Sequence, residues 1–138
     1  MGRGPLTIMV VDDDVDFADM LAATLRAEGH DVHVAPTSTH AVALAGTVRF
    51  DCVLLDLNLG GDGDGFDVAR NLRAGPLRAT AVIIMLTGTP HAAPQDAADA
   101  VGVDLVLAKP VNLDLIDGLI RQLLSIRVRK VAPYIRPD

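Results

Sequence analysis

Five strongly apolar segments alternate along the chain with five segments of helical character, and this alternation limits the fold more than any other feature. The predicted strands are residues 6–11, 31–35, 51–57, 81–87 and 104–108. Their nearly continuous runs of Val, Ile and Leu are typical of strands buried on both faces. The strict alternation predicts an α/β fold in which helices cover both faces of a five-stranded parallel sheet.

The five helices are predicted from apolar spacing and from residues that cap helix ends. The first follows Asp14, which we expect to be its N-cap, and ends at Gly29. The second takes Ser38 or Thr39 as cap, the fifth takes Asn112, and two prolines between 89 and 95 predict a late start for the fourth. The predicted ranges of the last four helices are 38–48, 66–74, 91–101 and 112–126.

Size, charge and cysteine content narrow the class of protein. The 138 residues suit one domain, which we place at 5–126 with a C-terminal extension at 127–138. The net charge of −6 argues against direct nucleic-acid binding, and no apolar run reaches the ~18 residues that span a membrane. Cys52, the single cysteine, is predicted to be buried, and we expect a cytoplasmic protein. The histidines lack metal-ligand spacing and are predicted at the surface: His30, His33, His40 and His91.

Polar residues follow four of the five predicted strands at their carboxyl ends, where α/β sheets bind ligands. They are Asp12, Asp13 and Asp14 after the first strand, Asp56 after the third, Thr87 after the fourth and Lys109 after the fifth. Clustered carboxylates suit a hard cation such as Mg²⁺, and no EF-hand spacing favours Ca²⁺. A carboxylate such as Asp56 can attack phosphorus, and Thr87 and Lys109 can donate to phosphoryl oxygens. The sequence therefore predicts phosphoryl chemistry with Mg²⁺.

Four motifs resemble the receiver domain of two-component response regulators: VVDDD at 10–14, LLDLNL at 54–59, MLTG at 85–88 and LAKP at 107–110. The resemblance covers residues 6–126 and implies a flavodoxin-like, doubly wound sheet of strand order 2-1-3-4-5. It implies that Asp56 is the phosphoacceptor, assisted by Thr87 and Lys109, and that the Lys109–Pro110 peptide bond is cis. The implied Mg²⁺ ligands are Asp12, Asp13, Asp56 and the backbone carbonyl of Asn58.

The resemblance also implies a signalling role in place of an enzymatic one. A histidine kinase or histidine phosphotransfer protein would give its phosphoryl group to Asp56, forming an aspartyl phosphate. The phosphorylated protein would then contact a downstream protein target. Homodimers would form through the face made by the fourth helix, the fifth strand and the fifth helix.

Two positions depart from the family pattern. Gly60 stands where receivers usually carry proline, and the glycine expected four residues later is found one residue further on, at Gly65. The acids of this loop, Asp62 and Asp64, are predicted to be solvated. Val106 replaces the aromatic residue that usually lies three positions before the lysine, so the signal cannot be read through an aromatic ring there.

Two other functions are compatible with parts of the sequence. A haloacid-dehalogenase-type phosphatase would use Asp12 and Asp14, but Asp16 stands where its motif needs Thr or Val, and Asp56 would be idle. A pseudo-receiver would act as an interaction module without phosphorylation. The glycine-rich loop and Val106 favour that alternative, whereas the intact acids, Thr87 and Lys109 disfavour it.

Overall fold

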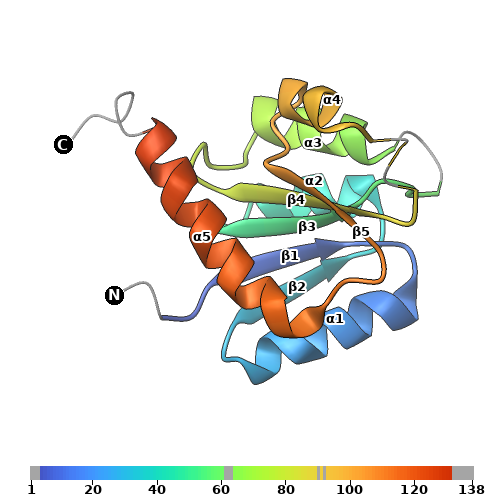
Figure 1. Ribbon diagram of the computed structural model, residues 1–138, viewed down its shortest axis with the longest axis vertical. Helices are drawn as coiled ribbons and strands as arrows, with labels where there is room; N and C mark the ends of the chain where they lie inside the picture. Colours follow the sequence, from blue (N-terminus) through green and yellow to red (C-terminus); the bar gives the residue numbers. More distant parts are fainter. Residues whose placement is uncertain (1–3, 61–63, 90, 92, 132–138) are drawn as a thin grey trace.

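The computed structural model describes residues 4–60, 64–89, 91 and 93–131 (Figure 1). The strands are β1 (Thr7–Val11), β2 (Asp31–Ala35), β3 (Cys52–Asp56), β4 (Val82–Thr87) and β5 (Leu105–Ala108). The helices are α1 (Val15–Ala27), α2 (Ser38–Ala45), α3 (Gly65–Ala74), α4 (Gln95–Ala100) and α5 (Leu113–Val131).

All strand pairs are parallel, and the sheet has the order β2-β1-β3-β4-β5, which confirms the predicted flavodoxin-like fold. The register places the carboxyl ends of neighbouring strands level with one another. Val11 pairs with Leu55, and Thr87 pairs with Ala108. Residues that directly follow these strands therefore meet at one edge of the sheet.

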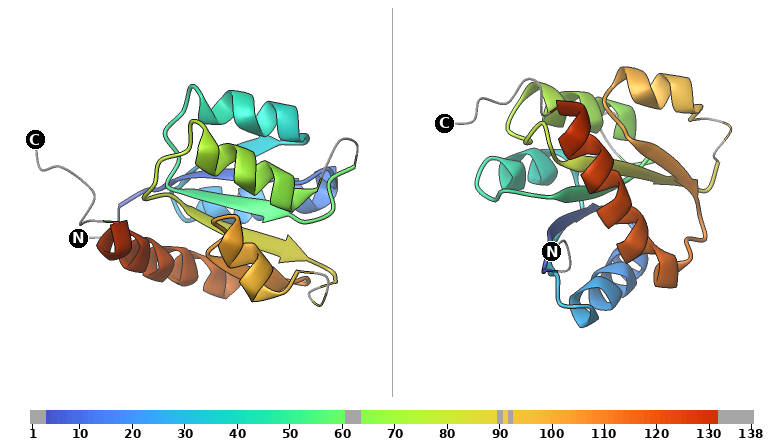
Figure 2. Two further views of the ribbon diagram at one scale, coloured as in Figure 1. Left: turned by 90° about the horizontal axis from the view of Figure 1, so that it is seen from above. Right: turned by 60° about the vertical axis from the view of Figure 1, so that its left-hand side comes forward.

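Helices cover both faces of the sheet (Figure 2). Alternate strand residues enter two separate cores, one on each face. One core joins the sheet to α2, α3 and α4, and includes Met9, Val53, Ile83 and Phe50. The other joins it to α1 and α5, and includes Cys52, which is fully buried as predicted. Both cores are mainly aliphatic, in keeping with an aromatic content of 3%.

Helix boundaries differ from those predicted at α2 and α5, and α4 starts four residues into its predicted range of 91–101, later still than expected. The N-cap of α2 is Thr37, whose Oγ1 accepts a hydrogen bond from the His40 amide at 3.1 Å, and not Ser38 or Thr39. Helix α4 has six residues and starts at Gln95, which confirms the expected late start. Helix α5 continues to Val131, so the prediction of its end at residue 126 is wrong.

The longer α5 is held by a charged cluster that the sequence did not reveal. Asp104, which precedes β5, accepts hydrogen bonds from Arg73 of α3 at 3.0 Å and from Arg127 of α5 at 2.9 Å. Arg127 also donates to the carbonyl oxygen of Ala79 at 2.8 Å. These contacts fix the helix beyond residue 126, whereas residues 132–138 of the predicted extension lie outside the described residues.

Helix α1 ends just before Gly29, as the sequence predicted. Gly29 follows the helix with a φ of +96°, a conformation that glycine adopts without steric cost. Over the residues that the structure describes, no helix combines the length and apolar character needed to cross a membrane.

Candidate functional site

The loop after β1 is shaped by its own aspartates. The amide of Asp12 donates to the carbonyl oxygen of Ala35 at 3.2 Å, which extends the β1–β2 pairing by one residue. Asp14 caps α1, as predicted, because its carboxylate accepts the amide of Phe17 at 3.2 Å. The carboxylate of Asp14 therefore caps the helix, and of the three consecutive aspartates only Asp12 and Asp13 contribute to the acidic cluster.

Asp12, Asp13 and Asp56 form one acidic cluster at the carboxyl edge of the sheet. One carboxylate oxygen from each lies within 4.8 Å of the others. Asp12 is 2% exposed and Asp56 is 7% exposed, while Asp13 is open to solvent. Residues 12 and 56 belong to different strand ends, so the sheet order brings together the acids that the sequence predicted to converge.

Lys109 reaches this cluster from the end of β5. Its ammonium group donates to Oδ2 of Asp12 at 3.0 Å and lies 3.5 Å from Oδ1 of Asp56. The Lys109 amide donates to the carbonyl oxygen of Thr87 at 2.8 Å, which ties the loop to the end of β4. The Lys109–Pro110 peptide bond is cis, as the family resemblance implied.

Burial and the close packing of charges in the cluster shift the pKa values of both Asp56 and Lys109. Burial, together with the negative charge of Asp12, raises the pKa of Asp56, and the nearby Lys109 offsets this only in part. Burial disfavours the charged form of Lys109, but its hydrogen bond to Asp12 and the charges of both carboxylates raise its pKa overall. One ammonium group thus faces two buried carboxylates, and the third carboxylate of the cluster, Asp13, is paired with the Gly60 amide instead.

Thr87 lies at the end of β4 and is fully buried. Its Oγ1 accepts the amide of Thr89 at 3.0 Å and lies 3.2 Å from the Thr89 hydroxyl. No contact between the Thr87 hydroxyl and the acids is present among the described residues. The structure therefore places this predicted residue at the correct strand end, with its hydroxyl engaged locally.

The loop after β3 supplies backbone groups to the site. The amide of Asn58 donates to Oδ1 of Asp56 at 3.2 Å, and the amide of Gly60 donates to Oδ2 of Asp13 at 3.0 Å. Asp64 caps α3 through a reciprocal capping box with Asp67, so it serves the helix. Asp62 lies outside the described residues.

Gly65 takes the place of the family glycine, one residue later than usual. A Cβ atom at this position would lie 2.6 Å from the carbonyl oxygen of Asp56 and 2.9 Å from the Cα of Leu57. The Gly65 amide donates to the carbonyl oxygen of Leu57 at 2.7 Å. Only glycine allows α3 to start this close to the backbone of residue 56.

The acidic cluster fits a magnesium ion. Mg²⁺ prefers carboxylate oxygens and keeps several waters, so one or two carboxylates and a solvent-facing side suffice. Asp12 and Asp56 provide buried oxygens, and Asp13 provides an exposed one. A divalent cation would also relieve the repulsion between Asp12 and Asp56 that raises the pKa of Asp56.

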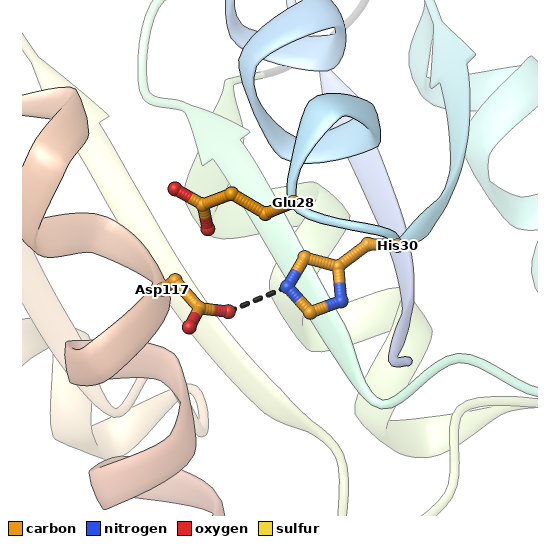
Figure 3. A group of neighbouring side chains, drawn as sticks. All are labelled: Glu28, His30 and Asp117. Carbon is orange, nitrogen blue, oxygen red and sulfur yellow. Dashed lines mark hydrogen bonds and ion pairs between the residues drawn. The ribbon is translucent and has the colours of Figure 1, made fainter. Parts of the chain in front are cut away.

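A second group with metal-ligand side chains, Glu28, His30 and Asp117, is a structural contact (Figure 3). Nδ1 of His30 accepts the amide of Leu6 at 2.9 Å, so the ring proton resides on Nε2, which pairs with Oδ1 of Asp117 at 2.5 Å. Both ring nitrogens are therefore occupied, and neither offers a lone pair to a metal.

This contact corrects one prediction about the histidines. His30 is 5% exposed, not at the surface, because its partner Asp117 lies 87 positions away on α5 and could not be recognised from local spacing. His33 is half-buried against the edge of Phe50, at 5.5 Å between ring centroids. His40 and His91 are exposed, as predicted.

Sequence reasoning missed one side chain beside the cluster. The ring of Phe17 in α1 lies under the ammonium group of Lys109, with 4.4 Å between Nζ and the ring centroid. Phe17 also packs against the core between the sheet and α1 and α5. No sequence signal connects it to a lysine 92 positions away.

Fold and site together define an α/β protein with a cluster of acids and one lysine at the carboxyl edge of a doubly wound sheet. The family model of the response regulator receiver domain matches residues 8–121. The chain belongs to the response regulator receiver domain family.

Curated relatives are longer than this chain. The transcriptional regulatory protein TcrA of Mycobacterium tuberculosis is 35% identical over 131 residues, which cover 88% of this chain and 51% of TcrA. The DNA-binding response regulator MtrA of Mycobacterium leprae is 42% identical over 108 residues, which cover 75% of this chain and 44% of MtrA. The chain thus spans about half the length of these relatives.

Solved structures share the whole fold. A CheY-like receiver domain protein from Methanospirillum hungatei has a TM-score of 0.80 at 25% identity, covering 92% of this chain and 99% of that chain. A response regulator from Burkholderia pseudomallei has a TM-score of 0.75 at 30% identity, covering 95% of this chain and 75% of that chain. The latter structure is described as containing a phosphorylated aspartic acid, a calcium ion and citrate.

Proposed function

We propose that Asp56 is the phosphoacceptor of this receiver domain, with Mg²⁺ held by Asp12, Asp13, Asp56 and the backbone carbonyl of Asn58. The convergence of three carboxylates within 4.8 Å of one another, with Lys109 beside two of them, is the observation that carries the proposal. The phosphorylated aspartic acid described in the Burkholderia pseudomallei relative supports the same chemistry. Mg²⁺ would supply charge neutralisation at the phosphoryl oxygens.

The chemical step is transfer from a phosphohistidine of a histidine kinase or phosphotransfer protein. A carboxylate oxygen of Asp56 attacks phosphorus and forms an O–P bond, while the P–N bond to the donor breaks. The donor nitrogen keeps the electron pair, and the histidine is left as a neutral imidazole after proton uptake. The product is an aspartyl phosphate.

Lys109 and Thr87 act on the phosphoryl group in different ways. The ammonium group already lies 3.5 Å from Oδ1 of Asp56, so it can pair with a phosphoryl oxygen with little movement. The hydroxyl of Thr87 lies against Thr89 and contacts none of the acids among the described residues, so the side chain moves toward the phosphoryl group to donate to it. Movement of Thr87 is then the first conformational consequence of phosphorylation.

The output surface is the face formed by α4, β5 and α5, through which the phosphorylated protein contacts a second copy or a downstream protein. The Val106 amide donates to the Gln95 side chain at 3.3 Å, which links α4 directly to β5. Val106 leaves no aromatic ring to move, so a shift of α4 through this link carries the signal. The chain itself contacts no nucleic acid in this proposal, although its longer relative MtrA is named as DNA-binding.

Intact-mass measurement after incubation with acetyl phosphate and Mg²⁺ tests the proposal. The wild-type chain should gain one phosphoryl group, and D56N should gain none. D16N, which removes an exposed acid of α1 outside the cluster, is the matched control and should behave as wild type. Absence of both an adduct and Mg²⁺ binding would favour a pseudo-receiver, and ester turnover that survives D56N but not D12N would favour a phosphatase.

A further inference from the structure

The ammonium group of Lys109 is surrounded by three groups, of which two are the acids of the site. Asp12 accepts its hydrogen bond at 3.0 Å, Asp56 lies at 3.5 Å, and the Phe17 ring lies 4.4 Å below it. The lysine side chain is 24% exposed, so the cation is partly desolvated. A cation over an aromatic face gains more when water is partly excluded than it does at an exposed site.

The position of the ring is fixed by the same loop that supplies the acids. Phe17 is the third residue of α1, and its amide is held by the capping carboxylate of Asp14 at 3.2 Å. Its side chain packs against the core between the sheet and α1 and α5. The ring is therefore held in place by its packing, whereas the four-carbon side chain of Lys109 can adopt many rotamers.

We infer that Phe17 is a positioning residue that holds the Lys109 ammonium group beside Asp56 before a phosphoryl donor arrives. The inference rests on the proposed role of Lys109 in phosphorylation. A cation that is already in place requires no reorganisation when negative charge develops on the phosphoryl oxygens. Phe17 contributes through the negative face of its ring, which an aliphatic side chain of similar volume lacks.

Fluorination of the Phe17 ring separates electrostatics from packing. Each fluorine weakens the negative face of the ring while changing its shape little. We expect the rate of Asp56 phosphorylation by acetyl phosphate, at saturating Mg²⁺, to fall stepwise through the mono-, di- and trifluorinated side chains. F17L, which removes the ring, should slow it by about 5- to 30-fold, while F17Y and F17W should stay close to wild type.

Phe50 supplies the matched control, because it is buried in the core on the opposite face of the sheet. Its trifluorinated form should phosphorylate at the wild-type rate, and urea unfolding midpoints of all fluorinated chains should match wild type. If F17L fails to fold, the fluorinated series alone decides. A rate that stays flat across that series would overturn the inference and leave Asp56 chemistry intact, whereas a wild-type chain that takes up no phosphoryl group would overturn both.

Discussion

Replacing Asp56 by Asn should stabilise the protein in the absence of metal. At an effective dielectric constant of about 20, two carboxylates no more than 4.8 Å apart repel by at least about 3.5 kcal/mol. The ammonium group of Lys109, 3.5 Å away, attracts the Asp56 carboxylate by about 4.7 kcal/mol at the same dielectric constant, so the net charge term favours the carboxylate by about 1 kcal/mol at most. Burial of the carboxylate then decides the sign, in agreement with the raised pKa of Asp56. We expect D56N to increase the free energy of unfolding by about 1–2 kcal/mol.

Urea unfolding followed by circular dichroism, with a chelator present, measures this gain. Because the folded-state pKa of Asp56 is raised, wild type gains stability as the pH falls through that pKa. The advantage of D56N should therefore shrink on acidification and disappear below the unfolded pKa, about 4.

Magnesium should reverse the order of stability. At a Mg²⁺ concentration 100 times the Kd, wild type gains about 2.7 kcal/mol, whereas D56N lacks one ligand and gains less. D16N is again the control. Its free energy of unfolding should rise by the same amount as that of wild type when the chelator is replaced by Mg²⁺. A lower urea midpoint for D56N than for wild type in chelator at every pH would refute the reasoning.

Three further substitutions test other contacts by urea unfolding. Gly65→Ala should cost about 2 kcal/mol, because its Cβ would meet a carbonyl oxygen at 2.6 Å. Gly118→Ala, with open space around it inside helix α5, should instead stabilise the protein by about 0.5–1 kcal/mol. Asp104→Ala should cost about 3 kcal/mol by leaving two half-buried guanidinium groups without their carboxylate. Asp117→Asn should cost about 1 kcal/mol at neutral pH. Burial opposes ionisation of Asp117, but its contacts with histidine and arginine lower its pKa overall. The difference in unfolding free energy between wild type and Asp117→Asn should therefore vanish as the pH falls through this lowered folded-state pKa.

The fold and most of the acidic cluster could be predicted from sequence because both follow from local patterns. Runs of aliphatic residues define the strands, and a parallel sheet gathers the residues that follow them at one edge. Asp12, Asp13, Asp56 and Lys109 meet for this reason alone. The strand order required the family resemblance, since alternation by itself leaves several parallel orders open.

Features that depend on distant partners could not be predicted. His30 is buried because Asp117 and the Leu6 amide satisfy its ring, and neither partner is near it in sequence. The end of α5 depends on the pairing of Arg127 with Asp104, which a pattern of charges in a helical tail does not reveal. Such contacts arise from tertiary packing, which overrides local preference.

Three carboxylates and one ammonium group leave two surplus negative charges at the carboxyl edge of the sheet. Phosphoryl donors are anions as well, and they meet this field on approach. Under the proposed function, a divalent cation that binds first would lower this repulsion and ease the approach of the donor. A shortage of free magnesium would then slow phosphorylation of Asp56, whatever the supply of phosphoryl donor.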